Sequence, residues 1–399
     1  MDMKYDFDKI IDRVNTDSVK YDLRKKVFGT NNLIPMWVAD MDFETPDFIT
    51  NAINERTKHK LLGYSYKSSI YYKSIVNWLE LQHNWLVHPK HISFSPGVVP
   101  GLVLSIMAFT QPGDKIIVQS PVYFPFYTSI KENGRQIINN SLVNNDGYYT
   151  MDLELLKSQI DSRTSMIIIS NPHNPVGRAW SKEELSDLLD ICVKNNVLIL
   201  SDEIHSDLVF EPNKHVPMAS ISDQAKNHVI TFMAASKTFN IAGLNSSFVI
   251  IANPKLRAVY NSYLDSYHLY LGNIFGSVAT ESAYANGADW LLQLKKYIAG
   301  NIRFAMDYFQ KNIPQIQIKE PEATYLLWLD FKFLKMSDKD LNKFLINDAK
   351  LGLNQGSVFG VEGAGFMRMN IACPRSVLEK ALRQLEKAVS LKSNSQLNA

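Results

Sequence analysis

Short apolar runs alternate with helical patterns through the middle of the chain. The runs are rich in β-branched or aromatic residues, are bounded by turn residues, and cover residues 92–95, 115–119, 166–170, 197–201, 228–233 and 248–252. Most are apolar throughout, which is typical of parallel strands covered by helices on both faces of a sheet. Between them, residues 181–195 predict a helix that begins with Ser181 as its N-cap and Glu184 as the capping-box partner. The pattern therefore predicts an α/β fold.

The pattern changes after residue 290. A long helical stretch at 290–311 leads to an apolar run at 324–331, a further helix, a glycine-rich loop and a last strand at 367–371. The chain has 399 residues, which is more than one hydrophobic core usually holds. We expect residues 50–290 to form a large domain, 291–399 a smaller α+β domain, and 1–49 a segment that packs with the smaller domain.

Composition and charge narrow the classes of partner. The net charge is +2, so nothing indicates a nucleic-acid or anionic-membrane partner. The first nine residues contain no apolar stretch typical of a secretion signal, and the longest apolar run, 97–109, is too short to span a bilayer. Neither of the two cysteines, Cys192 and Cys373, has metal-ligand spacing. We therefore expect a cytoplasmic protein without a metal site.

Ligands of doubly wound sheets gather at the carboxyl ends of the parallel strands, so the residues that follow each strand are the first candidates. After 92–95 come Gly97, Val98 and Val99 and an apolar helix. Gly97 lets the backbone approach a ligand closely, and the N–H groups at the start of a helix suit a phosphate. Taken alone, this turn is more often a plain strand–helix connection.

Three more strand ends carry polar side chains. Asn174 lies in the rigid turn after 166–170, Asp202 follows 197–201, and Lys237 follows 228–233. Each has an ordinary explanation when taken singly, as a turn residue, an ion-pair partner or a surface lysine. Together with the phosphate seat they match what pyridoxal 5′-phosphate (PLP) requires. The lysine forms a Schiff base with the cofactor aldehyde, the carboxylate keeps the pyridine nitrogen protonated, and the amide contacts the phenolate oxygen.

Two further residues complete the predicted site. Tyr123, after the strand at 115–119, is the candidate to cover the cofactor ring, and its hydroxyl could aid proton transfer. An ordinary packed aromatic remains the alternative. Lys237 and Tyr123 are thus the candidate catalytic residues. Arg368 follows the glycine-rich loop 356–365, and an arginine fork binds a substrate carboxylate through two hydrogen bonds. A surface arginine is the usual alternative.

The motifs resemble a known family over residues 30–388. Ala234-Ala235-Ser236-Lys237, Asn174-Pro175, Asp202 and Arg368, in this order and spacing, resemble fold-type I PLP enzymes of the class I/II aminotransferase superfamily. More specific segments resemble the MalY/PatB group of cystathionine β-lyases and cysteine-S-conjugate β-lyases: PMWVADMDF at 35–43, NPHNPVGR at 171–178, DEIH at 202–205, SKTFN at 236–240 and RMNIACP at 368–374.

The resemblance implies a PLP-dependent transferase-like fold whose large domain has a mainly parallel, seven-stranded sheet. It implies PLP on Lys237, and a cofactor site formed by Gly97, Val98, Val99, Tyr123, Asn174, Asp202, His205 and Ser236. It implies that Arg368, Ala39 and Tyr123 bind the amino-acid substrate. Tyr64 matches a tyrosine that reaches the phosphate of the neighbouring subunit, which implies a homodimer with shared active sites.

The chain departs from the wider superfamily at three positions near the cofactor. Many aminotransferases have tyrosine where this chain has His205, arginine where it has Asn245, and serine where it has Ala234. The phosphate is therefore expected to lack a charged clamp.

The resemblance favours α,β-elimination of L-cystathionine or related S-substituted cysteines to a thiol, pyruvate and ammonia. The catalytic residues alone do not distinguish a lyase from an aminotransferase, because both use the same lysine. Two alternatives stay open: an aminotransferase of an α-amino acid, and a lyase with an additional regulatory binding role.

Overall fold

The computed structural model describes residues 4–397, with side chains as far as residue 392. Residues 1–3, at the start of the segment in which we expected no secretion signal, lie outside this range. A seven-stranded sheet forms the centre of the larger body. Its spatial order is β2 (Ile92–Ser95), β10 (Ser247–Ile250), β9 (Val229–Met233), β8 (Leu198–Asp202), β7 (Thr164–Ser170), β3 (Lys115–Val118), β4 (Gln136–Asn139).

The sheet is mainly parallel, as predicted. β10 runs antiparallel to both of its neighbours, and the other neighbouring pairs are parallel. Six of the seven strands correspond to the apolar runs of the sequence. The seventh, β4, lies at the edge of the sheet and is only partly buried, which explains why its sequence QIIN gave no strand signal.

Helices cover both faces of the sheet, which is why its strands are apolar throughout. Met166 and Ile168 of β7 pack in a cluster with α5 (Val98–Phe109), α6 (Pro125–Lys131) and α10 (Pro254–Ser266). The alternate residues of the same strand, Ile167 and Ile169, pack on the opposite face with α4 (Ser69–His83) and α8 (Lys182–Lys194). The predicted capping box of α8 is present, because Ser181 accepts from the Glu184 N–H and Glu184 from the Ser181 N–H. Each buried strand thus contributes to two hydrophobic layers.

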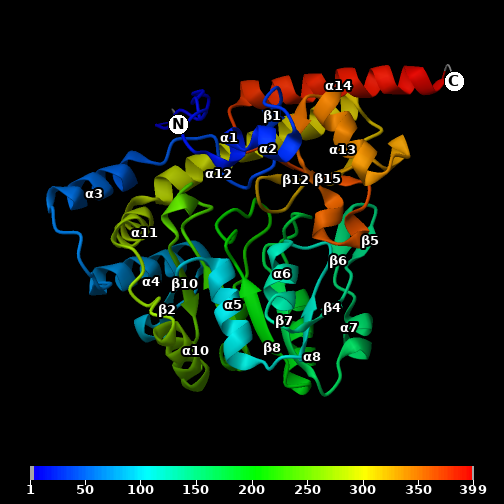
Figure 1. Cartoon of the computed structure of the whole chain (residues 1–399). Coiled ribbons are helices and arrows are strands. Elements are labelled where there is room, and N and C mark those ends of the chain that lie inside the picture. Colours follow the sequence, from blue (N-terminus) through cyan, green and yellow to red (C-terminus); the bar gives the residue numbers. More distant parts are fainter. Residues whose placement is uncertain (1–3, 398–399) are drawn as a thin grey trace.

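A second body is built on a four-stranded antiparallel sheet. Its order is β11 (Gln317–Ile318), β12 (Leu326–Asp330), β15 (Phe366–Asn370), β14 (Asn354–Gln355). Figure 1 shows the helices α12 (Ala288–Asn312), α13 (Asp338–Asn347) and α14 (Arg375–Leu397) grouped above the seven-stranded sheet. The N-terminal helices α1 (Val19–Asp22) and α2 (Arg24–Phe28) lie among them. Next to these helices, β1 (Ile34–Pro35) pairs in parallel with β13 (Leu351–Gly352).

The division of the chain into three parts at residues 49 and 290 remains a prediction. The second predicted boundary falls inside α12, and one hydrophobic cluster runs from the seven-stranded sheet into β12 and β15. The remaining elements are α3 (Asp47–Lys58), α7 (Leu153–Gln159), α9 (Asp223–His228), α11 (Ile274–Asn286), the antiparallel pair β5 (Val143–Asn145) and β6 (Tyr148–Thr150), and six short 3-10 turns.

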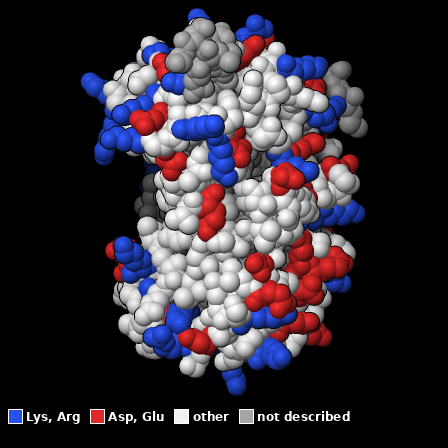
Figure 2. Space-filling model, turned by 90° about the vertical axis from the view of Figure 1, so that its right-hand side faces the viewer, with Lys and Arg blue, Asp and Glu red and all other residues white. Residues whose placement is uncertain are grey.

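Surface charge, helix hydropathy and cysteine burial can be compared with what the composition indicated. On the face in Figure 2, basic and acidic side chains are interspersed above, and acidic side chains are more frequent at the lower right. Among residues 4–397, no helix has both the length and the apolar character to cross a bilayer. Both cysteines are buried thiols.

Candidate active site

A cavity of about 340 Å³ opens at the edge of the seven-stranded sheet where the parallel strands end. Eleven of the twelve predicted cofactor and substrate residues line it: Ala39, Gly97, Val98, Val99, Tyr123, Asn174, Asp202, His205, Ser236, Lys237 and Arg368. Tyr64 is the exception. It lies between α3 and α4 and is 98% exposed. The contact of Tyr64 with the site of a second subunit stays a prediction.

The first wall of the cavity is the turn from β2 into α5. Gly97 precedes the helix, and a Cβ atom at this position would lie 3.2 Å from the Pro100 ring. The N–H groups of Val98 and Val99 stand in the first turn of α5, where an α-helix has no carbonyl partners for them. This end of α5 is therefore suited to an anionic group such as a phosphate.

Asp202 ends β8 with its carboxyl group almost fully buried. Its Oδ1 accepts a hydrogen bond of 3.1 Å from the Ile204 N–H. Burial raises the pKa of Asp202 to about 7, and the nearby Glu203 raises it as well, whereas the Ile204 N–H and Lys237 lower it. A buried carboxylate of this kind gains most from a positively charged N–H partner.

Lys237 stands in the turn after β9, and its Nζ donates to the Ala39 carbonyl oxygen at 2.6 Å. Burial and the positive charge of Arg368 lower the pKa of Lys237 to about 8, although Asp40 and Asp202 act in the opposite direction. Near pH 7.5, Lys237 is therefore a neutral amine in an appreciable fraction of the protein molecules. The neutral amine is the form that attacks a carbonyl carbon.

Arg368 is buried on β15 and orients Asn174. One of its terminal nitrogens donates to Asn174 Oδ1 at 3.0 Å, which leaves the Asn174 amide N–H groups free to face the cavity. The other terminal nitrogen donates to the Trp37 carbonyl at 2.9 Å and to Asn354 Oδ1 at 2.7 Å. Burial lowers the pKa of Arg368 to about 10, so the guanidinium remains charged at neutral pH. Sequence reasoning missed Asn354, because a two-residue strand carries no pattern.

Two rings face this charged set. Burial, and to a lesser degree Asp202, raise the pKa of Tyr123, so its hydroxyl keeps its proton at neutral pH. Burial likewise holds the pKa of His205 well below its usual value, with Lys237 and Arg368 adding to the effect, so the ring is neutral. His205 packs edge-on against Tyr325 at 5.9 Å between ring centres, and its buried Nδ1 has no hydrogen-bond partner among the described residues.

The sequence also missed two serines in the cavity wall, Ser246 and Ser247, which follow Asn245. These serines stand at the start of a strand and not after one, because β10 is antiparallel and its first residues reach the same edge. Asn245, which stands where many aminotransferases have arginine, lines the cavity in the left-handed conformation with φ +46°. Hydroxyl and amide groups therefore line the same cavity as Ser236 and the start of α5.

The residues of the cavity fit PLP. The seat at α5 suits its phosphate, Asp202 suits a protonated ring nitrogen, Asn174 has free N–H donors for the phenolate oxygen, and Lys237 is an amine of lowered pKa. The unpartnered Nδ1 of His205 is a further buried polar atom that a ligand in the cavity could satisfy.

The chain belongs to the aminotransferase class I and II family, whose model matches residues 31–385. It is 41% identical to the cystathionine beta-lyase PatB of Bacillus subtilis over 96% of this chain and 100% of the relative. It is 31% identical to the protein MalY of Escherichia coli over 96% of this chain and 99% of the relative. The PLP-bound C-S lyase from Staphylococcus hominis has 36% identity and a TM-score of 0.90, with 97% of this chain and 98% of that chain covered. The resemblance to the MalY/PatB group is confirmed.

Proposed function

We propose that the protein is a PLP-dependent carbon–sulfur lyase that cleaves L-cystathionine or related S-substituted cysteines by α,β-elimination. The products are a thiol, pyruvate and ammonia. The observation that carries the proposal is the meeting of Lys237, Asp202 and Arg368 in one cavity, in a chain that is 41% identical over its length to a cystathionine beta-lyase.

When bound, PLP would supply a ring that accepts the electron pair left at Cα after a proton is removed. The α5 N-terminus and Ser236 would hold its phosphate, Asp202 would keep its ring nitrogen protonated, and Asn174 would donate to its phenolate oxygen. Tyr123 would cover the ring. Arg368 binds the substrate α-carboxylate, because its planar fork matches two carboxylate oxygens.

Lys237 moves the proton. As a neutral amine it takes the proton from the substrate Cα, and the C–S bond at Cβ then breaks with its electrons going to sulfur. The protonated Lys237 or the Tyr123 hydroxyl returns a proton to the leaving thiolate. The remaining 2-aminoacrylate is hydrolysed to pyruvate and ammonia, which balances the reaction with one water.

The experiment that tests the proposal uses the purified protein with PLP and L-cystathionine and without any keto acid. We expect equal amounts of pyruvate and homocysteine, and no products from Lys237→Ala. Turnover that appears only when a keto acid is added would overturn the lyase and favour an aminotransferase. A panel of S-substituted cysteines scored for pyruvate then identifies the preferred substituent.

We also propose a homodimer with shared active sites in the cytoplasm. The segment between α3 and α4 exposes a run of large apolar side chains: Leu61, Leu62, Tyr64, Tyr66 and, at the start of α4, Ile70. Such a run is typical of a surface that a second subunit covers. The buried, unpaired cysteines suit a reducing compartment.

A further inference from the structure

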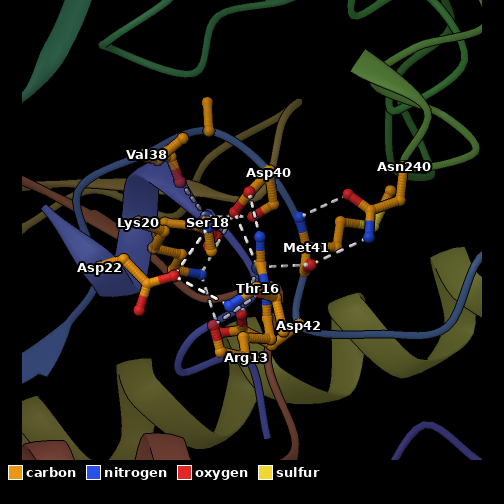
Figure 3. A network of polar contacts seen from close by, with 12 residues as sticks. Arg13, Thr16, Ser18, Lys20, Asp22, Val38, Asp40, Met41, Asp42 and Asn240 are labelled. Carbon is orange, nitrogen blue, oxygen red and sulfur yellow. Dashed lines mark hydrogen bonds and ion pairs between the residues drawn. The ribbon is translucent and has the colours of Figure 1, made fainter. Parts of the chain in front are cut away.

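The N-terminal segment forms a largely buried ion network with residues 36–43, which we call the active-site loop. Arg13 donates to both carboxyl oxygens of Asp40, at 2.6 and 3.2 Å, and to Asp42 Oδ1 at 2.7 Å. Lys20, which is 1% exposed, donates to Asp42 Oδ2 at 2.8 Å. Figure 3 shows these four side chains converging at one end of the loop. Two cations thus neutralise two aspartates.

This network attaches the active-site loop to the N-terminal segment. Charges removed from water are costly unless they are paired and hydrogen-bonded, and here each carboxylate has a partner within 2.8 Å. Arg13 donates in addition to the Met41 carbonyl, and Trp37 Nε1 donates to the Lys20 carbonyl at 3.1 Å. The N-terminal segment therefore holds the loop at both ends.

Two asparagines join the same loop to the catalytic residues. Asn240, three residues after Lys237, accepts from the Met41 N–H and donates to the carbonyls of Met41 and Phe43 (Figure 3). Asn370, two residues after Arg368, donates to the carbonyls of Val38 and Asp40. Hence a shift of the loop changes its position relative to both Lys237 and Arg368.

The centre of the loop is the Ala39 carbonyl, which faces Lys237. This oxygen accepts from Lys237 Nζ at 2.6 Å and from the Tyr325 hydroxyl at 3.0 Å. Both terminal nitrogens of Arg13 donate hydrogen bonds to the neighbouring residue, Asp40. The ion network therefore acts one peptide unit away from the atom that holds the lysine amine.

We propose that Arg13 and Lys20 are positioning residues. They hold the active-site loop so that the Ala39 carbonyl keeps the Lys237 amine in the cavity whenever that amine is not joined to the cofactor. In catalysis this retains the amine beside the substrate Cα, so the inference rests on the proposed function. The alternative is that these ion pairs only stabilise the fold and do not change how Lys237 reacts.

The test compares Arg13→Gln and Arg13→Lys with Lys9→Gln. Lys9 is a matched control, because it lies in the same segment and forms an ion pair with Glu44 that is exposed on both sides. For each variant we would titrate the cofactor-free protein with PLP to obtain the dissociation constant, and measure its thermal unfolding midpoint. We would also measure kcat and KM for pyruvate formation by the PLP-loaded protein. We expect Arg13→Gln to weaken PLP binding and lower kcat, each by about tenfold or more, with a smaller change in KM.

The control and the conservative variant decide the outcome. Arg13→Lys keeps the charge but has no fork, so we expect it to fold with an intermediate kcat and PLP affinity. If the Arg13 variants bind PLP and turn over like Lys9→Gln, the inference is wrong. If Arg13→Gln does not fold, an Arg13→Lys variant with unchanged PLP affinity and kcat would overturn it equally.

The two proposals fail in different ways. A wild-type protein that binds PLP but forms no pyruvate contradicts the lyase function, while the PLP affinities of the Arg13 variants still test the positioning role. Normal pyruvate formation with Arg13 variants equal to the control leaves the lyase function intact and removes the positioning role.

Discussion

Burial moves the pKa values of the two residues proposed to act on the cofactor toward each other. The pKa of Lys237 falls to about 8, and that of Asp202 rises to about 7. Both shifts have desolvation as their largest cause, since a charge is less stable in a cavity that excludes water. The cofactor-free site thus holds an acid and a base that both titrate near neutral pH.

Asp40→Asn should make the Lys237 amine react at lower pH. The Asp40 charge raises the pKa of Lys237, in opposition to burial and Arg368, so its removal lets that pKa fall below about 8. We would measure the rate at which PLP binds to the cofactor-free protein as a function of pH, because only the neutral amine attacks the aldehyde. The control is Glu44→Gln, which removes an exposed charge. An Asp40→Asn profile that coincides with both wild type and control would contradict this expectation.

Asp202→Asn should stabilise the cofactor-free protein at high pH while weakening its affinity for PLP. Because the pKa of Asp202 is raised in the folded state, its favourable contribution is lost as the pH rises through about 7. Between pH 5.5 and 8.5 the variant should gain about 2 kcal/mol in free energy of unfolding relative to wild type. Urea titrations of both proteins at the two pH values check this, and a constant difference would refute it.

The carboxyl-end rule accounts for how much of the site the sequence predicts at this scale. Gly97, Tyr123, Asn174, Asp202 and Lys237 were found because parallel strands all deliver their next residues to one edge. Ser246 and Ser247 were not found, because the sequence does not reveal that one strand is reversed. The contact of Asn354 with Arg368 comes from the pairing of β14 with β15, and that of Trp37 from the packing of the N-terminal segment against β15. No local pattern in the sequence encodes either contact.

Among the elements, the turn from residue 171 to 178 joins the two sheets. It begins at the end of β7, and its Gly177 carbonyl accepts from the N–H groups of Glu322 and Ala323 just before β12. Arg178 adds ion pairs to Glu184 and Glu322. The turn that carries Asn174 is therefore braced against the smaller sheet.

Gly177→Ala should weaken the contact between this turn and the segment before β12. Gly177 has φ +73°, and an added Cβ would lie 2.7 Å from Pro321 Cβ. Both the left-handed backbone and the clash oppose a side chain, so we expect a loss of about 1–3 kcal/mol in the free energy of unfolding. The control is Gly243→Ala, where an added Cβ meets no atom within 4 Å. Equal unfolding midpoints of the two variants in urea would show that the turn tolerates the side chain.

Elements with strong patterns were predicted well, and those held by tertiary contacts were not. The buried strands and the capped helix α8 agree with their sequence ranges to within two residues at each end. The edge strand β4 was missed because it is half-exposed. The N-terminal forty residues contain little regular structure and are fixed by ion pairs such as those of Arg13, which no hydrophobic period reveals.

For the whole molecule, the proposed shared sites predict complementation between two defective chains. Lys237→Ala lacks the lysine in its own site, and Tyr64→Phe lacks the hydroxyl proposed to reach the partner's site. A mixed dimer would contain one site with an intact Lys237 from one chain and an intact Tyr64 from the other. We expect the mixture, after subunit exchange, to show more lyase activity than the sum of the separate variants. Activity equal to that sum would indicate that each subunit forms a complete site.

The active-site loop also sets the order in which the site can form during synthesis. Its contacts come from Arg13, Asn240 and Asn370, which are spread over almost the whole length of the chain. Contacts between residues so distant in sequence form late in folding. A nascent chain that has already released the Lys237 turn from the ribosome still lacks β15, and so cannot close the loop around the lysine. Capture of the cofactor in its final geometry is therefore an event of the completed chain.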